Sequence, residues 1–291
     1  KIRNTQTSQK SKMLSNLYDL EYAKISLKAQ FIKAYISSIQ ISNEIKIFEE
    51  NLYNLKKIKD ITDSRILKGL SSPDEIHLAS ANYFLYESNL LTKKIEIKSI
   101  KRKLELMLGK YPTNSMSLVY QYPAHIYDIK SELSSDLILR RPDILSKKEK
   151  LNFLNSKLIA NKKALFPSFA ITNSIGQSSS DLESLFDPKT SIWNVGVSIL
   201  QPIFQSGRIN KNIEISEQEL SMSDIEYVEA VMNAFYETEN YLDLDRSLKE
   251  VQDKISQSNQ DMEKAVIYAI RSYELGLVDL LYVLNLQQQL F

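Results

Sequence analysis

The sequence contains no cysteine, and its 291 residues include only six glycines and seven prolines. The absence of cysteine excludes disulfide bonds and thiol chemistry from this chain, although it leaves the cellular compartment open. A formal net charge of +1 gives no electrostatic reason to expect a nucleic-acid partner. No apolar run reaches the roughly eighteen residues of a transmembrane helix. Any membrane-spanning elements must therefore be β-strands.

Motifs for catalysis and metal binding are also missing. The two histidines, His77 and His125, lie far apart in the sequence and have no neighbouring cysteines or paired carboxylates, so we predict no metal site. The chain has no phosphate-binding glycine motif and no nucleophile elbow, and we expect no cofactor. We therefore predict that the protein is not an enzyme.

Glycine and proline are entirely absent from two runs, residues 1–68 and 208–275, which have equal lengths. Each run ends at a glycine followed by leucine, Gly69-Leu70 and Gly276-Leu277, and an offset of 207 residues superimposes one glycine on the other. Apolar positions coincide at the same offset along both runs. We interpret this pattern as an internal duplication.

Each run is predicted to form one helix roughly 100 Å long, at about 1.5 Å per residue. Apolar residues alternate at steps of three and four, which indicates a coiled-coil seam. A second apolar set lies off this seam, so the first helix offers surface to more than one neighbour, as in the wall of a tube. An ordinary coiled coil is the alternative. The first seam contains Ile41, Ile45, Phe48, Leu52 and Leu55; the second contains Leu244, Leu248, Val251, Ile255, Ser258, Met262 and Ala265; the additional set includes Phe31, Tyr35, Ile47 and Ile58.

A returning helix is predicted to start at Pro73, with Ser72 as its N-cap and Glu75 completing a capping box. It ends near Gly109, which can adopt the left-handed C-cap conformation. Residues 110–135 interrupt the helical pattern and are interpreted as a connector. A further helix is expected to begin near residue 135 or at Pro142 and to run to about residue 165.

From residue 168 the apolar period changes from 3.6 to two. Two strands of about ten residues each carry one apolar and one small polar face, with Asn173 as the polar residue on the apolar face. This pattern is typical of an outer-membrane hairpin, although a half-buried hairpin of a soluble protein is the alternative. Two strands cannot close a sheet in lipid, so the membrane interpretation requires several identical chains around one axis. The predicted lipid-facing residues are Phe169, Ile171, Ile175, Trp193, Val195, Val197 and Ile199.

The duplication also predicts a strand pair before Lys1, because a strand pair precedes its equivalent, Arg208. At the other end, Phe291 corresponds to Phe84, so the equivalent of residues 85–108 is expected beyond it. We therefore expect both ends of a longer protein to be missing.

Several segments together carry a family resemblance. They are LRRPDI at residues 139–144, ALFPSF at 164–169, SSSDL at 178–182 and PIFQSGR at 202–208, with Gly176 and Trp193 between them. As a set they resemble the TolC-type outer-membrane factor family, the exit ducts of Gram-negative tripartite efflux pumps. The resemblance covers the whole chain and is closest to the lipoproteins that serve resistance-nodulation-division (RND) pumps.

The resemblance implies a mainly α fold: an internally duplicated α-helical coiled-coil tunnel joined to strands of an outer-membrane β-barrel. It also implies a homotrimer with four strands per chain, in contact with outer-membrane lipid. The implied partners are a periplasmic adaptor (membrane fusion) protein, which meets the helix tips, and an inner-membrane RND transporter. The implied docking residues are Gly69, Leu70, Ser71, Leu275, Gly276 and Leu277.

The family often narrows its tunnel with rings of carboxylates just after the tips. Glu75 fits an acidic position in the first repeat, whereas the second repeat has Tyr282 and Asn285 where some members carry aspartates. Asp279 is nearby but at another helical phase. We therefore expect an aperture lined by these four residues, without an established acidic ring.

The predicted organisation has five segments. The predicted function is a passive trimeric duct of a tripartite pump that exports drugs or other small toxic compounds and is opened when the adaptor docks. The alternatives are a soluble coiled-coil scaffold and an outer-membrane duct for protein secretion. The segments are a first-repeat tunnel hairpin (1–109, tip 69–72), an equatorial connector (110–135), a tunnel helix (136–165), a transmembrane hairpin (166–205) and a second-repeat tunnel hairpin (206–291, tip 275–280).

Overall fold

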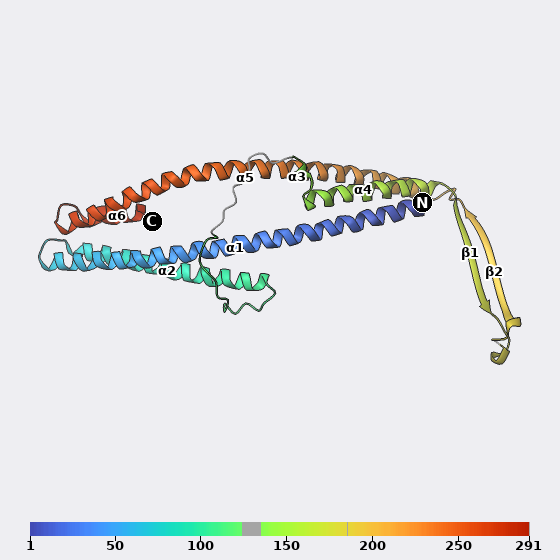
Figure 1. Ribbon diagram of the computed structural model, residues 1–291, viewed down its shortest axis with the longest axis horizontal. Coiled ribbons are helices and arrows are strands. Elements are labelled where there is room, and N and C mark those ends of the chain that lie inside the picture. Colours follow the sequence, from blue (N-terminus) through green and yellow to red (C-terminus); the bar gives the residue numbers. More distant parts are fainter. Residues whose placement is uncertain (124–134, 185, 291) are drawn as a thin grey trace. The chain divides into compact units, whose positions relative to one another are not determined.

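The computed structural model describes residues 1–123, 135–184 and 186–290 (Figure 1). Residues 124–134 of the predicted connector, which include His125, lie outside the described residues, as does Phe291. Along the chain the elements are α1 (Ile2–Leu67), α2 (Pro73–Met107), α3 (Ser135–Leu139), α4 (Pro142–Lys162), β1 (Ser168–Gln177), β2 (Ser191–Leu200), α5 (Arg208–Glu274) and α6 (Leu280–Leu290), with short 3-10 turns at Lys163–Leu165, Leu182–Ser184 and Pro188–Thr190.

The two runs without glycine or proline form α1 and α5, as predicted. The 207-residue offset also relates the ends of these helices, Leu67 and Glu274, and the starts of the helices that follow, Pro73 and Leu280. The repeat seen in the sequence is therefore also a repeat of secondary structure.

The chain forms two compact units. Unit 1 contains Lys1–Ala23 and Leu133–Glu237, and unit 2 contains Lys24–Glu132 and Thr238–Phe291. Helices α1 and α5 each contribute their first part to unit 1 and their remaining part to unit 2. Among the described helices, none is both long enough and apolar enough to cross a membrane.

In unit 1, the starts of α1 and α5 pack with α3 and α4. Buried serines mediate the contact of α1 with α4: the Ser8 hydroxyl donates to the carbonyl of Phe153 at 3.1 Å, and the Ser15 and Ser146 hydroxyls are 3.1 Å apart. A small apolar core joins α3, α4 and α5. It contains Ile138, Ile144 and Ala234, with Tyr227, Val231 and Phe235 packed against it.

The predicted tunnel element, residues 136–165, contains two helices, and a helix begins at each of the two starts that the sequence left open. The helix is interrupted between α3 and α4, where Arg141 adopts an extended backbone conformation, with φ −58° and ψ 134°. Pro142 causes this interruption, because it lacks an N–H and disfavours helical geometry in the preceding residue. The Arg141 side chain bonds Asp143 and Glu237 at 2.9 Å each and so ties the break to α5.

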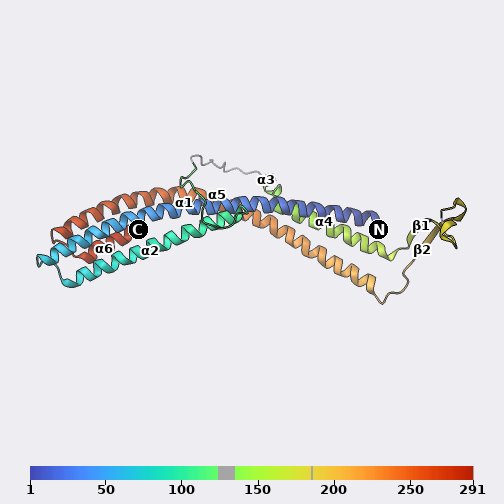
Figure 2. The ribbon, with the colours of Figure 1, turned by 90° about the horizontal axis from the view of Figure 1, so that it is seen from below.

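In unit 2, parts of α1, α2, α5 and α6 lie side by side (Figure 2), and their side chains form a larger apolar core. The ends of α1 and α5 meet the start of α2 and the whole of α6. Farther from the tips, α1 and α2 are joined by an aromatic contact of Phe48 with Tyr86 and an ion pair of Glu44 with Lys93 at 3.0 Å. The buried core residues are Leu55, Ile58, Ala79, Ala269, Tyr273, Leu280, Val283 and Leu284.

The two predicted seams differ in burial. On α1 the seam residues are half-buried or buried, and Leu55 belongs to the core. On α5, by contrast, Leu244, Leu248 and Ile255 are 45–56% exposed. The described part of the chain therefore leaves this stretch of α5 uncovered.

Glu105 binds the first part of the predicted connector, residues 110–123, to the end of α2 in unit 2. This carboxylate is buried and accepts bonds from the backbone N–H groups of Asn114 at 2.7 Å and Met116 at 2.9 Å. Burial by itself raises the pKa of Glu105, but these backbone bonds outweigh it and hold the pKa below its ordinary value. The Tyr35 hydroxyl adds a bond to the carbonyl of Val119 at 2.6 Å.

Candidate functional site: the strand pair and the helix tips

The strand pair is antiparallel, and its register assigns every predicted lipid-facing residue to one face. Phe169 pairs with Ile199, Ile171 with Val197 and Ile175 with Trp193. Because side chains alternate along a strand, these pairs and Asn173 with Val195 share a face. The opposite face carries mainly small or polar residues. Its pairs include Ala170 with Ser198, Thr172 with Gly196 and Ser174 with Asn194.

The dimensions of the hairpin match a bilayer. Each strand has ten residues, which span about 30 Å at about 3.4 Å per residue. A tilt of about 40° reduces this to about 23 Å, close to the apolar band of roughly 25 Å in outer-membrane proteins. Neither strand contains Asp, Glu, Lys or Arg.

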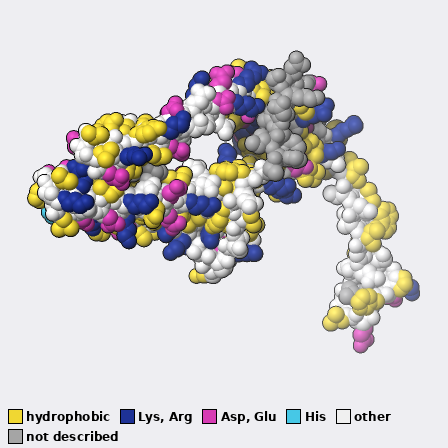
Figure 3. Space-filling model, turned by 60° about the vertical axis from the view of Figure 1, so that its left-hand side comes forward, with side chains coloured by type: hydrophobic (Ala, Val, Ile, Leu, Met, Phe, Trp, Pro, Cys, Tyr) yellow, Lys and Arg dark blue, Asp and Glu magenta, His cyan; other side chains and the backbone are white. Residues whose placement is uncertain are grey.

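Both faces of the hairpin are exposed in the described part of the chain. Trp193 is 74% exposed, and hydrophobic side chains follow the hairpin on the face shown in Figure 3. The half-buried hairpin of a soluble protein would instead place these residues in a core. An uncovered apolar face of this size indicates a surface that another phase or protein covers.

The helix tips of unit 2 have the same backbone geometry in both repeats. The N–H of Gly69 bonds the carbonyl of Ile66 and that of Leu70 bonds Arg65, at 2.9 and 2.8 Å. In the second repeat Gly276 and Leu277 make the equivalent two bonds, to Tyr273 and Ser272. Both glycines have a positive φ, +70° and +77°, as a helix-terminating turn of this kind requires. The predicted tip residues Gly69 and Leu70 thus occupy a turn that matches the turn of Gly276 and Leu277. Both leucines are exposed.

Arg65 joins the two tips. Its guanidinium donates to the carbonyl of Leu70 at 3.0 Å and the hydroxyl of Ser71 at 2.8 Å in the first tip. It also donates to the carbonyl of Tyr273 at 2.6 Å, at the end of α5, and lies 4.6 Å from the ring centre of the same tyrosine. A cation at the carbonyl end of a helix is favourable because it neutralises unpaired acceptors there.

Tyr273 is the centre of a buried polar network. It is fully buried, and its hydroxyl donates to the Glu75 carboxylate at 2.8 Å and lies 3.1 Å from the Thr62 hydroxyl. Burial raises the pKa of Tyr273, so the phenol remains a donor at neutral pH. The network connects α1, α2 and α5 directly behind the exposed tips.

The predicted capping box does not form. The Ser72 hydroxyl bonds the Asp74 carboxylate instead of capping the backbone of α2, and Glu75 turns toward Tyr273. The other predicted aperture residues lie at the start of α6 or on it. Asp279 caps this helix by accepting from the N–H of Tyr282 at 2.8 Å. Tyr282 and Asn285, three residues apart, are both exposed on α6, whereas Glu75 is half-buried in the Tyr273 network.

Sequence reasoning did not select Arg65, Thr62 or Tyr273. Arg65 and Tyr273 precede the tip glycines closely, but their contact joins residues 208 positions apart. A single sequence carries no signal for that pairing. The described residues contain no cluster of His, Asp and Glu that could hold a metal ion.

Comparison with known proteins gives consistent similarities. The profile of the outer membrane efflux protein family matches residues 133–291, more than half of the chain. The cation efflux system protein CusC of Escherichia coli K12 is 28% identical over 301 residues, covering 100% of this chain and 64% of CusC. Outer membrane protein OprJ of Pseudomonas aeruginosa is 26% identical over 275 residues, covering 92% of this chain and 57% of OprJ. The chain thus spans less than two thirds of the length of either relative.

The fold has a close counterpart in a crystal structure of CusC. The two superimpose with a TM-score of 0.85 at 26% identity, over 99% of this chain and 67% of the CusC chain. The Campylobacter jejuni CmeC outer membrane channel also matches, with a TM-score of 0.83 at 23% identity, over 99% of this chain and 62% of that one.

Proposed function

Because this chain belongs to the outer membrane efflux protein family, we propose that it forms the exit duct of a tripartite, RND-type efflux pump. It is a protein of the Gram-negative outer membrane. The proposed duct is passive: it exports drugs or other small toxic compounds, and an inner-membrane transporter supplies the energy.

The observation that carries this proposal is the hairpin of β1 and β2. One of its faces is continuously apolar apart from Asn173, and neither strand carries a charge. Two strands leave unpaired backbone groups at both edges, and such groups cost several kcal/mol each in lipid. Several copies of the chain must therefore complete a closed sheet, and we propose a homotrimer.

We propose the exposed tips as the docking surface for a periplasmic adaptor protein. Leu70 and Leu277 are presented on turns of matching geometry, so an adaptor with a repeated apolar contact could engage both repeats. Gly69 and Gly276 shape these turns, and the neighbouring Ser71 and Leu275 complete the proposed surface.

The proposed aperture follows the tips. Tyr282 and Asn285 are exposed on α6, where symmetry would repeat each side chain around an axis. Asp279 and Glu75 already have partners in the chain, so their contribution to an acidic ring depends on release from those bonds. In this proposal, adaptor docking opens the aperture by loosening the contacts that Arg65 and Tyr273 make between the helices.

We retain the proposed division of the chain, with one change. Residues 1–109 and 206–291 form tunnel hairpins, 166–205 the transmembrane hairpin and 110–135 the connector. The tunnel element at 136–165 consists of α3 and α4 instead of one helix.

The test is cell fractionation followed by reconstitution of the gene product. The proposal predicts an outer-membrane protein that is extracted only by detergent, migrates as a trimer and conducts ions across a planar bilayer. The scaffold alternative predicts a protein that stays in solution without detergent. A monomer in the soluble fraction would refute the duct. Adaptor binding should be lost when Leu70 and Leu277 are both replaced by Asp, and retained when the exposed residues Tyr282 and Asn285 are replaced by Ala.

A further inference from the structure

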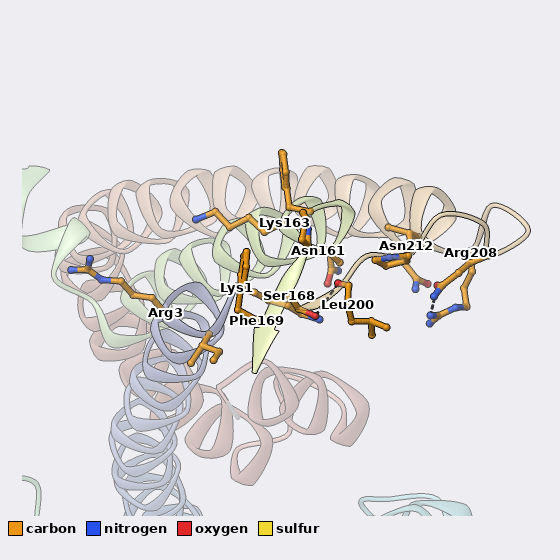
Figure 4. Close-up of a pocket in the computed structure, with 16 residues that line it drawn as sticks. Lys1, Arg3, Asn161, Lys163, Ser168, Phe169, Leu200, Arg208 and Asn212 are labelled. Carbon is orange, nitrogen blue, oxygen red and sulfur yellow. Dashed lines mark hydrogen bonds between the residues drawn. The ribbon is translucent and has the colours of Figure 1, made fainter. Parts of the chain in front are cut away.

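In unit 1, the ends of the strands join the helices around an open hollow of about 860 Å³. Four basic residues line it: Lys1 and Arg3 at the start of α1, Lys163 just after α4, and Arg208 at the start of α5 (Figure 4). We call this surface the basic junction.

The charges of the basic junction are not compensated within the described part of the chain. No Asp or Glu is among the described residues that line the hollow, and none of the four basic residues forms an ion pair there. Lys163 donates to the amide oxygen of Asn4 at 2.8 Å, and Arg208 donates to that of Gln205. Both acceptors are neutral, so the positive charges remain.

Neighbouring lysines differ from the basic junction in this respect. Lys157 pairs with Glu219 at 2.6 Å, and Lys162 pairs with Glu217 at 2.9 Å. The carboxylates of α5 that lie next to the end of α4 are thus paired with lysines outside the basic junction. The carboxylates of α5 next to the hollow therefore do not neutralise the basic junction.

An apolar surface adjoins these charges. Phe166 and Phe169 line the same hollow and are about two thirds exposed, and Phe204, shortly before Arg208, is also exposed. The apolar face of the hairpin begins at the pair Phe169 and Ile199, one residue pair from the strand ends. Positive charge therefore lies at the boundary of the apolar face, which is where phospholipid headgroups lie when a hairpin spans a membrane.

The arrangement fits a layer of anions better than one small anion. In Figure 4, the side chains of Arg3 and Arg208 extend toward opposite sides of the strand end, with Lys163 between them. A single phosphate would need convergent donors. Several headgroups, each beside one cation and with acyl chains along the apolar face, match both the spread of charge and the adjoining phenylalanines.

We propose that the basic junction binds anionic phospholipids of the leaflet next to the helices. This inference rests on the proposed function, because it requires the hairpin to span the membrane. Lys or Arg near an anionic membrane surface contributes to lipid association about fivefold per residue, and salt weakens the effect. Loss of two such residues should reduce the preference for anionic lipid by about 25-fold at low salt.

The experiment uses the full chain reconstituted in phosphatidylcholine vesicles that contain a small amount of spin-labelled phosphatidylglycerol or spin-labelled phosphatidylcholine. Electron spin resonance measures the relative association of each lipid with the protein. The test variant is Lys163→Gln with Arg208→Gln. The matched control is Lys148→Gln with Arg140→Gln, two exposed residues of the same unit that do not line the hollow.

A parallel measurement separates this inference from the proposed function. Brominated acyl chains should quench the fluorescence of Trp193, on the lipid face, in the wild type and in both double variants. Absence of quenching in the wild type would refute the membrane-spanning hairpin itself. With quenching present, the wild type and the control should prefer phosphatidylglycerol strongly, and the test variant should lose most of this preference. Equal lipid association in all three proteins, or a preference that the test variant retains, would overturn the basic junction alone.

Discussion

The most informative substitution is Tyr273→Phe, because it removes one hydroxyl and leaves the buried ring in place. The hydroxyl donates to the Glu75 carboxylate at 2.8 Å, and a hydrogen bond to a charged group contributes about 1.5–3 kcal/mol. Glu75 is half-buried and can regain water, and Thr62 keeps its bond to the carbonyl of Ile58 at 2.8 Å. We therefore expect a value at the lower end of this range, so that the free energy of local opening at the tips falls by about 1.5 kcal/mol.

Hydrogen exchange at the tips measures this loss directly. The N–H groups of Leu70 and Leu277 close the two turns, so their exchange reports local opening of the network. A loss of about 1.4 kcal/mol corresponds to about tenfold faster exchange when opening is at equilibrium. Tyr282→Phe is the matched control, because Tyr282 is exposed on α6 and lies outside the network that Tyr273 forms with Glu75 and Thr62.

Equal exchange rates at the tips in Tyr273→Phe and Tyr282→Phe would refute this prediction. In that case the hydroxyl would contribute nothing beyond the packing of the ring. Faster exchange only at residues remote from the tips would equally refute it, because the network connects elements that meet behind the two turns.

Three further predictions concern other parts of the chain. Gly276→Ala and Gly69→Ala should each lower the free energy of unfolding by about 1 kcal/mol or more, because both positions have a positive φ and an added Cβ meets no more than an ordinary van der Waals contact at either. Thermal unfolding measures the two losses, and an unchanged stability in either variant would contradict the role of the positive φ. Val195→Arg, on the apolar face, should weaken membrane insertion by about 2–4 kcal/mol and so lower the yield of protein in the outer membrane. Asn194→Arg, on the opposite face, should have little effect, and similar yields of the two variants would argue against the assignment of the apolar face to lipid. The pKa of Glu105 is lowered in the folded chain, so the stability that its carboxylate contributes is present above the ordinary carboxyl pKa and is lost as pH falls through the lowered pKa. Proteolysis of residues 110–119 should therefore increase in acid, and Glu105→Gln should remove this pH dependence.

The periodic parts of the fold could be predicted from sequence because each depends on local chemistry. The absence of glycine and proline predicts α1 and α5, and the alternation of apolar residues predicts both strands and the face they share. The glycines at 69 and 276 were identified as helix ends because few other residues tolerate a positive φ. Family resemblance then supplied the membrane assignment that strand pattern alone left open.

The contacts between distant segments could not be predicted in this way. Glu75 was expected to cap its own helix, but it bonds Tyr273 because a buried phenol offers a donor in a site with little water. The interruption at Arg141 was left open because the local pattern permits a helix start at either 135 or 142, and the contact of Arg141 with Glu237 on α5 joins residues 96 positions apart. Glu105 gave no sequence signal, since its partners are backbone N–H groups of an irregular segment.

The first repeat supplies the side chain that joins the two tips, Arg65, and the second repeat supplies only backbone acceptors. The counterpart of Arg65 at the 207-residue offset is Ser272, so the second repeat has no arginine with which to return the contact. The acceptors on α5 are main-chain oxygens, which no replacement of Tyr273 or Glu274 can delete. A substitution at codon 65 therefore removes the donor itself, whereas a side-chain substitution at 273 or 274 leaves the acceptors in place, so the two repeats are unequal targets for selection.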